Sequence, residues 1–273
     1  MSSASPSMPP PELADNLIHR FNVGDALRRS AARYPLKRAI RFQGRELTYA
    51  QLDSLSNRMA RFLLQAGIRR GDPVAILGLN SPEYVAAFFG CARIGAPLVP
   101  INLMLTPDDI DFVLDKVKAK AILTAPILKG KLNHEGPVVK GLGHQWTMDA
   151  AFDAAVAGLD GSHVEEFVAN EDAATIIFTS GTTARPKGVI NTHLNWYANL
   201  ISAFGDSTFN RHHKFLLALT CSISPASPTC GPASRPAWNP SSSHCRSRTS
   251  SLTPFRSTRS ISSVCLRPST SDC

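Results

Sequence analysis

Short apolar runs alternate with amphipathic segments over most of this 273-residue chain, and this alternation constrains its fold more than any other feature. The runs at 74–77, 98–101, 121–124 and 173–178 have the length and composition of buried strands. The segments between several of them carry apolar residues at helical spacing and are joined to the strands by short loops. Strands that alternate with helices in this way predict an α/β fold with a mostly parallel sheet, covered by helices on both faces.

The expected helices have recognisable start and stop signals. Thr48 and Gln51 have the Thr-x-x-Gln spacing of a capping box, and Gly67 follows the end of the same helix. Ser81 and Pro82 are placed where a cap residue and a first-turn proline begin the next helix. The other elements expected are helices at 22–34, from 106, at 150–157 and at 193–204, and strands at 38–42 and 215–219.

The two ends of the chain differ in composition from its middle. Residues 1–12 are rich in Pro and Ser, and residues 1–19 are expected to be a disordered N-terminus. Residues 20–220 hold nearly all of the periodic pattern and are expected to form one incomplete domain. Residues 221–273 contain 16 Ser, 7 Pro and 6 Arg. Such a composition buries too little apolar surface to offset the entropy lost on ordering, so an unstructured tail is expected.

Most of the net charge of +8 lies in this tail, where six Arg and a single acid give +5. Translation of a GC-rich gene in a shifted reading frame would produce such a Ser-, Pro-, Arg- and Cys-rich segment. The break also falls inside an expected core strand, where no domain boundary belongs. The alternative is an Arg/Ser-rich tail that binds nucleic acid through its phosphates. The frameshift is the favoured interpretation, and no specific nucleic-acid partner is expected.

Cysteine follows the same division, because Cys91 is the single cysteine before residue 220. No pair of cysteines has the spacing of a zinc site, and His134, His144 and His163 also lack metal-ligand spacing. These histidines are expected to be solvated loop residues, and no metal site is expected. One buried cysteine is typical of a reducing compartment, and the sequence shows neither a signal peptide nor an apolar run of about 18 residues. A cytoplasmic location without a membrane span is therefore expected.

The turn after the run 173–178 has the composition of a phosphate-binding loop. It places four hydroxyl groups around one glycine and continues to a lysine, in the order Thr179, Ser180, Gly181, Thr182, Thr183, Ala184, Arg185, Pro186, Lys187, Gly188. Hydroxyl and backbone N–H groups donate hydrogen bonds to phosphate, glycine permits close approach, and lysine adds a positive charge. The Walker A and Rossmann glycine patterns are not met. On residue types alone, an ordinary polar turn between two strands is the alternative.

This turn resembles the signature loop of the adenylate-forming superfamily, which includes acyl-CoA synthetases, luciferases and the adenylation domains of peptide synthetases. The family loop is Thr-Ser-Gly-Thr-Thr-Gly-x-Pro-Lys-Gly and contacts the phosphates of ATP. The one departure is Ala184; if a positive φ is required there, alanine costs on the order of 1 kcal/mol. The order of the segments before the turn extends the resemblance to roughly residues 20–220. By this match, the nucleotide-binding residues are Thr179, Ser180, Gly181, Thr182, Thr183, Lys187 and Gly188.

The resemblance implies a fatty-acid–CoA ligase that uses ATP, Mg²⁺ and coenzyme A. A carboxylic acid, of fatty-acid type, would attack the α-phosphate of ATP, and the thiol of coenzyme A would then displace AMP from the acyl-adenylate. The family's Tyr-Gly-x-Thr-Glu segment, its ribose-binding aspartate and its C-terminal lysine domain have no counterpart in these residues. No catalytic residue is therefore assigned, and the chain is expected to be inactive. The alternatives are a non-catalytic nucleotide-binding remnant and nucleic-acid binding through the basic tail.

Overall fold

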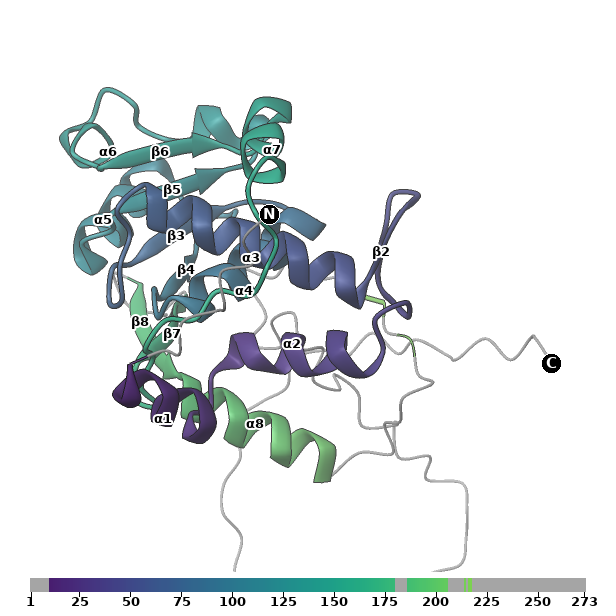
Figure 1. The fold of residues 1–273 in the computed structure, drawn as a ribbon. Coiled ribbons are helices and arrows are strands. Elements are labelled where there is room, and N and C mark those ends of the chain that lie inside the picture. The colour runs from purple at the N-terminus through teal and green to yellow at the C-terminus, as the bar shows by residue number, and fades with distance from the viewer. Residues whose placement is uncertain (1–9, 180–185, 206–213, 215, 218–273) are drawn as a thin grey trace, which may run out of the picture.

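The computed structural model describes residues 10–179, 186–205, 214 and 216–217, and its centre is a six-stranded sheet (Figure 1). The strands are β3 (Val74–Leu77), β4 (Leu98–Pro100), β5 (Ala121–Thr124), β6 (His144–Thr147), β7 (Ala173–Thr179) and β8 (Lys187–Thr192). Their order across the sheet is β6-β5-β3-β4-β7-β8. The first five run parallel to one another, whereas β8 runs antiparallel to β7. The predicted mostly parallel α/β sheet is confirmed.

Helices cover both faces of this sheet. They are α1 (Pro11–His19), α2 (Val23–Arg33), α3 (Tyr49–Gln65), α4 (Pro82–Arg93), α5 (Pro107–Val117), the 3₁₀ helix η1 (Pro126–Lys131), α6 (Pro137–Lys140), α7 (Ala150–Ala157) and α8 (His193–Gly205). Helices α2, α3, α4 and α7 contribute to a larger core cluster on one face, while α5 and α6 contribute to a smaller cluster on the other. A separate antiparallel hairpin, β1 (Arg38–Phe42) with β2 (Arg45–Thr48), precedes α3.

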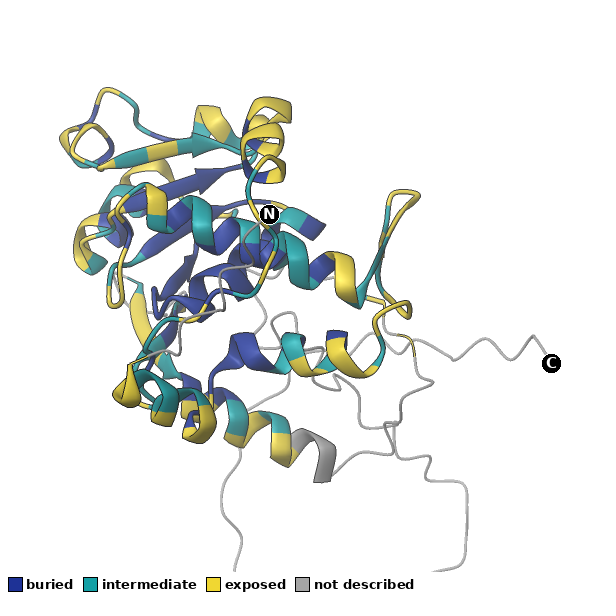
Figure 2. Ribbon diagram, viewed as in Figure 1, coloured by how far each residue is buried: buried dark blue, intermediate teal, exposed yellow. Residues whose placement is uncertain are grey.

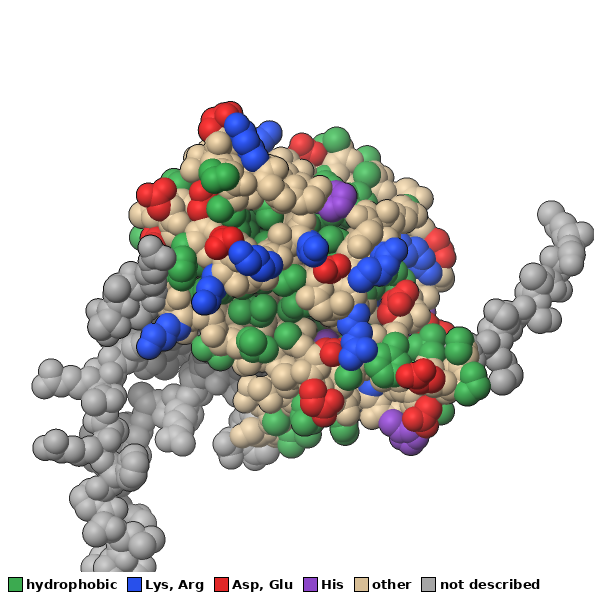
Figure 3. All heavy atoms as spheres, turned by 90° about the vertical axis from the view of Figure 1, so that its left-hand side faces the viewer, with side chains coloured by type: hydrophobic (Ala, Val, Ile, Leu, Met, Phe, Trp, Pro, Cys, Tyr) green, Lys and Arg blue, Asp and Glu red, His purple; other side chains and the backbone are tan. Residues whose placement is uncertain are grey.

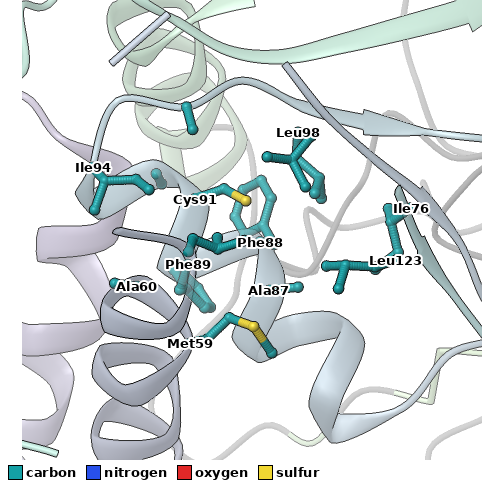
Figure 4. Packing of buried hydrophobic residues seen from close by; sticks show 14 of the residues in the cluster. Met59, Ala60, Ile76, Ala87, Phe88, Phe89, Cys91, Ile94, Leu98 and Leu123 are labelled. Carbon is teal, nitrogen blue, oxygen red and sulfur yellow. The ribbon is translucent and has the colours of Figure 1, made fainter. Parts of the chain in front are cut away.

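Strands β3 and β4 are apolar at every position because both of their faces are covered. In β3, Val74 and Ile76 belong to the larger cluster, whereas Ala75 and Leu77 belong to the smaller one. This alternation follows from the two-residue period of a strand. Figure 2 shows the central strands buried, and Figure 4 shows side chains from α3, α4 and the strands meeting in the larger cluster. A short apolar run is therefore the sequence signal of a strand that is covered on both faces of the sheet.

The helix boundaries confirm the signals in the sequence. Thr48 and Gln51 form a reciprocal capping box at the start of α3, with the Gln51 N–H donating to the Thr48 hydroxyl at 3.2 Å. The hydroxyl of Ser81 likewise accepts from the N–H of Tyr84 at 3.1 Å at the start of α4. Gly67, after α3, has a φ of +84°, a conformation that glycine adopts at little cost. These local signals are sufficient to place both helices.

Several elements were not predicted from the sequence. Strand β2, η1, α6 and β6 all lack a continuous apolar run or a full helical period. Strand β6 is half-buried along most of its length because it lies at one edge of the sheet. Its residues His144 to Thr147 alternate polar and aromatic side chains, so the sequence gives only a weak strand signal.

Helix α1 corrects the expectation of disorder for residues 1–19, because residues 11–19 are helical. Asn16 explains its position: the side-chain amide donates to the carbonyl of Val168 at 2.9 Å, and its oxygen accepts from the N–H of Val168 at 3.3 Å. The next residue after the helix, Arg20, is buried and forms an ion pair with Asp25 at 2.8 Å. The Asn16 hydrogen bonds join segments 152 residues apart, which a local composition argument does not detect.

The C-terminal predictions fall mostly outside the described residues. Of the strand expected at 215–219, only Leu216 and Leu217 are described, and neither is in a strand or helix. Leu217 nevertheless packs against the larger core cluster. The tail 221–273 lies wholly outside the described residues. Within the described part of the chain, no helix has both the length and the apolarity needed to cross a bilayer.

Candidate nucleotide-binding site

The expected phosphate-binding turn connects β7 to β8. Thr179 pairs with Lys187 at the end of this hairpin, and the Thr179 hydroxyl donates to the Lys187 carbonyl oxygen at 3.5 Å. Both residues are exposed, so the hydroxyl of Thr179 and the ammonium group of Lys187 are both at the molecular surface. The residues between them that were predicted to bind phosphate lie outside the described residues: Ser180, Gly181, Thr182 and Thr183. Their assignment stays a prediction.

The turn of the hairpin lies at the carboxyl ends of the parallel strands, which is where nucleotide sites occur in α/β folds. Strand β7 is parallel to β4, so the turn lies on the same side as the carboxyl ends of β3, β4 and β5. Loops at this edge bind ligands in open α/β sheets because several strands end there together. The position therefore agrees with a phosphate-binding function.

Gly188 has a packing role in addition to its place in the predicted motif. A Cβ atom at this position would lie 3.0 Å from Cζ of Phe178 and 3.4 Å from Cγ2 of Ile176. The absence of a side chain lets the Phe178 ring lie against the paired strand. Since Phe178 precedes Thr179 directly, this contact helps to fix the end of the hairpin.

Helix α8, which follows β8, is attached to the core by hydrogen bonds that the sequence analysis missed. The indole N–H of Trp196 donates to the hydroxyl of Thr175 in β7 at 3.2 Å, and both residues are buried. The Nδ1 atom of His193 accepts from the backbone N–H of Val23 at 3.2 Å. The Trp196 ring also packs edge-on against Phe88, with centroids 5.5 Å apart. No local pattern could reveal these contacts, because the partners lie far apart in the sequence.

An ion pair fixes the amino end of β7. Arg70 contacts the Asp172 carboxylate through two nitrogens, Nε at 2.6 Å and Nη2 at 2.9 Å, and the N–H of Ala169 donates to the same carboxylate at 2.8 Å. Burial tends to raise the pKa of Asp172, but the hydrogen bonds from Arg70 and Ala169 hold this pKa below its usual value. The Asp172 carbonyl in turn accepts from the N–H of His193 at 3.1 Å. The base of the hairpin is thus held on both strands.

A second ionic group lies under α2, α3 and α4. Arg93 is fully buried; its guanidinium donates to Asp53 and to the Asn57 side chain, each at 2.5 Å, and lies 3.2 Å from Nδ1 of His163. Burial, followed by the charges of Arg28 and Arg93, lowers the pKa of His163. His163 lies in a loop as expected, but the expectation that it is solvated is wrong, because its ring packs against a buried cation.

The other two histidines differ in their surroundings. His144 lies in strand β6 and stacks on Trp146, with ring centroids 4.8 Å apart, so its assignment to a loop is also wrong. His134 lies in a turn, where Nε2 donates to the Lys129 carbonyl at 2.9 Å. Among the described residues, no group of three or more His, Cys, Asp or Glu side chains is arranged to hold a metal ion. No described residue is therefore assigned to Mg²⁺.

The surface of the described body does not resemble a nucleic-acid interface on the face that Figure 3 shows. Lys and Arg side chains on this face are interspersed with Asp and Glu rather than gathered in one uninterrupted patch. Several of the basic residues form surface ion pairs, such as Lys140 with Glu135 at 2.6 Å and Lys118 with Asp115 at 2.8 Å. The hypothesis of nucleic-acid binding concerns the tail, which lies outside the described residues.

The mostly parallel sheet with helices on both faces defines an α/β protein, and the β7–β8 hairpin turns at the carboxyl ends of its parallel strands. Residues 27–226 match the family described as AMP-binding enzyme, and the chain belongs to this family. The resemblance to adenylate-forming enzymes is therefore confirmed. The match covers most of the chain, including the whole of the predicted turn.

Two curated relatives are acid–CoA ligases. Long-chain-fatty-acid–CoA ligase FadD13 of Mycobacterium tuberculosis is 34% identical over 181 residues, which cover 63% of this chain and 35% of that protein. Crotonobetaine/carnitine–CoA ligase of Salmonella typhimurium is 33% identical over 168 residues, which cover 55% of this chain and 31% of that protein. The chain thus spans about a third of the length of the curated relatives it matches.

Solved structures with a similar fold also include acyl-CoA ligases and synthetases. The inhibitor-bound N-terminal domain of FACL13 from Mycobacterium tuberculosis is 28% identical with a TM-score of 0.67, and the match covers 74% of this chain and 52% of that one. The o-succinylbenzoate CoA synthetase MenE from Bacillus subtilis, in complex with its acyl-adenylate, is 28% identical with a TM-score of 0.60, covering 72% and 49%. The described fold is therefore shared with acyl-CoA ligase N-terminal regions.

Proposed function

We propose that residues 20–220 are the N-terminal part of an ATP-dependent acyl-CoA synthetase, and that the turn 179–188 binds the phosphates of ATP. The observation that carries this proposal is the pairing of Thr179 with Lys187 at the carboxyl end of β7. It brings a hydroxyl donor and a positive charge to the same end of one hairpin. Membership in the AMP-binding family and the names of the relatives support the same assignment.

The proposed chemistry requires neutralisation of negative charge as pyrophosphate leaves. The carboxylate of an acid, of fatty-acid type, attacks the α-phosphorus of ATP and gives an acyl-adenylate and pyrophosphate. Lys187 and the hydroxyls of Thr179, Ser180, Thr182 and Thr183 would stabilise this charge, while Gly181 and Gly188 would let the backbone approach the phosphates. The thiol of coenzyme A then displaces AMP. Mg²⁺ would add positive charge at the phosphates in such a reaction.

The 273-residue polypeptide by itself is expected to have little or no ligase activity. Its sequence contains no Tyr-Gly-x-Thr-Glu segment and no ribose-binding aspartate of the family type. We propose that residues 221–273 result from a shifted reading frame. We also propose that the protein is located in the cytoplasm.

A non-catalytic nucleotide-binding remnant is the second candidate function, favoured by the composition of the tail. The coding DNA tests the frame: a neighbouring frame beyond codon 220 should encode the missing family segments.

Calorimetric titration of the chain with a non-hydrolysable ATP analogue tests the binding site. Loss of a charge-assisted contact in Lys187→Gln should weaken binding about tenfold or more. Lys120→Gln is the matched control, because Lys120 is exposed at the opposite end of the sheet, next to the start of β5. Equal affinity of the wild type and Lys187→Gln would refute the assignment. Pyrophosphate release with a panel of fatty acids, at the rate of an intact synthetase, would refute the expected inactivity.

A further inference from the structure

A second polar hollow, of about 270 Å³, lies at the carboxyl ends of β5 and β6. It is lined by Thr124, Lys129, Leu132, His134, Gln145, Trp146 and Thr147. Strands β3 and β4 separate β5 from β7. Three strand spacings correspond to about 14 Å, so this hollow is distinct from the turn after β7.

Two threonines form one wall of the hollow. Thr124 and Thr147 are register partners at the ends of β5 and β6. Thr124 is only 3% exposed, and its hydroxyl has no hydrogen-bond partner within the described part of the chain. A buried hydroxyl without a partner costs free energy, so such groups in folded proteins call for an explanation. A ligand that accepts a hydrogen bond there would supply one.

The polar side chains of both strands face the same side of the sheet. Ile122 belongs to the smaller core cluster, and the two-residue period places Thr124 on that face. In β6 the amide of Gln145 donates to the Val139 carbonyl of α6 at 2.7 Å, which places Gln145 and Thr147 on this side too. Hydroxyl and amide groups from two strands therefore converge beneath η1 and the turn that follows it.

The charge around this hollow is positive. Lys129 has no ion pair among the described residues, and no carboxylate lines the hollow. Nearby Glu135 is already paired with Lys140 at 2.6 Å. Because Nε2 of His134 donates to the Lys129 carbonyl, Nδ1 is left for another partner. By contrast, a hollow of about 260 Å³ beside α1 is lined by three carboxylates together with His19 and Arg20, so the hollow at β5 and β6 differs from it in having no acidic side chain.

We propose that the hollow at β5 and β6 binds a phosphate group, either as inorganic phosphate or as part of a small phosphate monoester. Hydroxyl donors together with a lysine ammonium group are the side chains that bind phosphate oxygens by charge-assisted hydrogen bonds. In this site Thr124 and Thr147 would donate from the sheet, and Lys129 would supply the charge from η1. This binding function is independent of the turn at 179–188.

Calorimetric titration of the full chain with inorganic phosphate and, separately, with ribose 5-phosphate tests this site. Thr147→Val removes one hydroxyl at nearly constant volume, and Lys129→Gln removes the charge. Each should weaken binding about tenfold, as expected for the loss of one hydrogen bond to a charged group. Lys120→Gln should retain the wild-type affinity, which separates this site from general surface charge. The losses in Thr147→Val and Lys129→Gln separate it from the turn at 179–188, which contains neither residue.

The outcomes are decisive in both directions. Tighter binding of ribose 5-phosphate identifies a monoester as the ligand, whereas tighter binding of inorganic phosphate identifies the free ion. Absence of measurable binding to the wild type overturns the proposal, as does an equal loss of affinity in Lys120→Gln. If Thr147→Val changes the circular dichroism spectrum, the exposed Lys129→Gln variant decides the result alone.

Discussion

Acidification should weaken the attachment of α8 to the core through one buried histidine, His193. This residue has no exposed surface, and its Nδ1 atom accepts the N–H of Val23 at 3.2 Å. The ring is therefore neutral, with its proton on Nε2. Protonation would place a second N–H group against the donor of Val23. Burial lowers the pKa of His193 from 6.5 to about 4; the charge of Asp172 opposes this shift, and that of Arg20 assists it.

The size of the stability loss follows from the difference between the pKa of His193 in the unfolded and in the folded chain. The ordinary pKa of 6.5 and the folded value of about 4 differ by about 2.5 units. At roughly 1.4 kcal/mol per unit, His193 accounts for ~3 kcal/mol of pH-dependent stability. Between pH 6.5 and 4 the unfolded chain binds the proton and the folded chain does not. The free energy of unfolding therefore falls as the pH is lowered through this window, and is unaffected by this group well above pH 7.

Urea unfolding at pH 7, 5 and 4 measures this loss, with His193→Asn as the reference variant. Asn keeps an acceptor near the position of Nδ1 but does not titrate. Relative to this variant, the wild type should lose about 2 kcal/mol between pH 7 and pH 5 and about 3 kcal/mol by pH 4. The comparison removes the contribution of His163, whose pKa is also lowered. Equal losses in the two proteins would refute the interpretation of His193 as a buried neutral residue.

Two further predictions concern the packing of the α3–α4 region. Burial raises the pKa of the Cys91 thiol to about 12. A thiol reagent at pH 8 should therefore label the peptide that contains Cys91 only after denaturation, as measured by peptide mass mapping. Labelling of this peptide in the folded protein would contradict the burial of Cys91. Thr48→Ala removes the capping hydroxyl that accepts from the N–H of Gln51, and it should lower the free energy of unfolding, measured in urea, by ~1 kcal/mol. Thr48→Ser keeps a hydroxyl and should lower this free energy much less. Equal losses of stability in the two variants would exclude the cap as the cause.

The elements found from the sequence are those whose signals are local. Helix α3 begins at a capping box that involves residues three apart, and Ser81 caps α4 at the same spacing. Strands β3 and β5 are buried on both faces, so β3 is an uninterrupted apolar run and β5 is apolar up to its last residue, Thr124. In these cases the physical cause of the structure lies within the segment itself, and the sequence shows it directly.

The elements missed from the sequence depend on distant partners. Helix α1 is held by Asn16 and Val168, which are 152 residues apart. The surroundings of His163 result from Arg93, and those of His193 from Val23, 170 residues away. A single-sequence argument assigns Asn16 and His163 by their local surroundings, which are polar, and therefore predicts solvation where the fold creates burial. For His193 it predicts the helix but not the buried ring.

The candidate site combines both kinds of information. The residue types of the turn are local, so the sequence identifies Thr179 and Lys187 as phosphate-binding candidates. Their orientation depends on the register of β7 and β8, because a slip of one residue would turn Lys187 to the opposite face of the sheet. This register is set by core contacts that carry no phosphate chemistry, namely the bond of Trp196 to Thr175 and the fit of Phe178 over Gly188. Substitutions at such core positions should therefore alter nucleotide binding without any contact with the nucleotide.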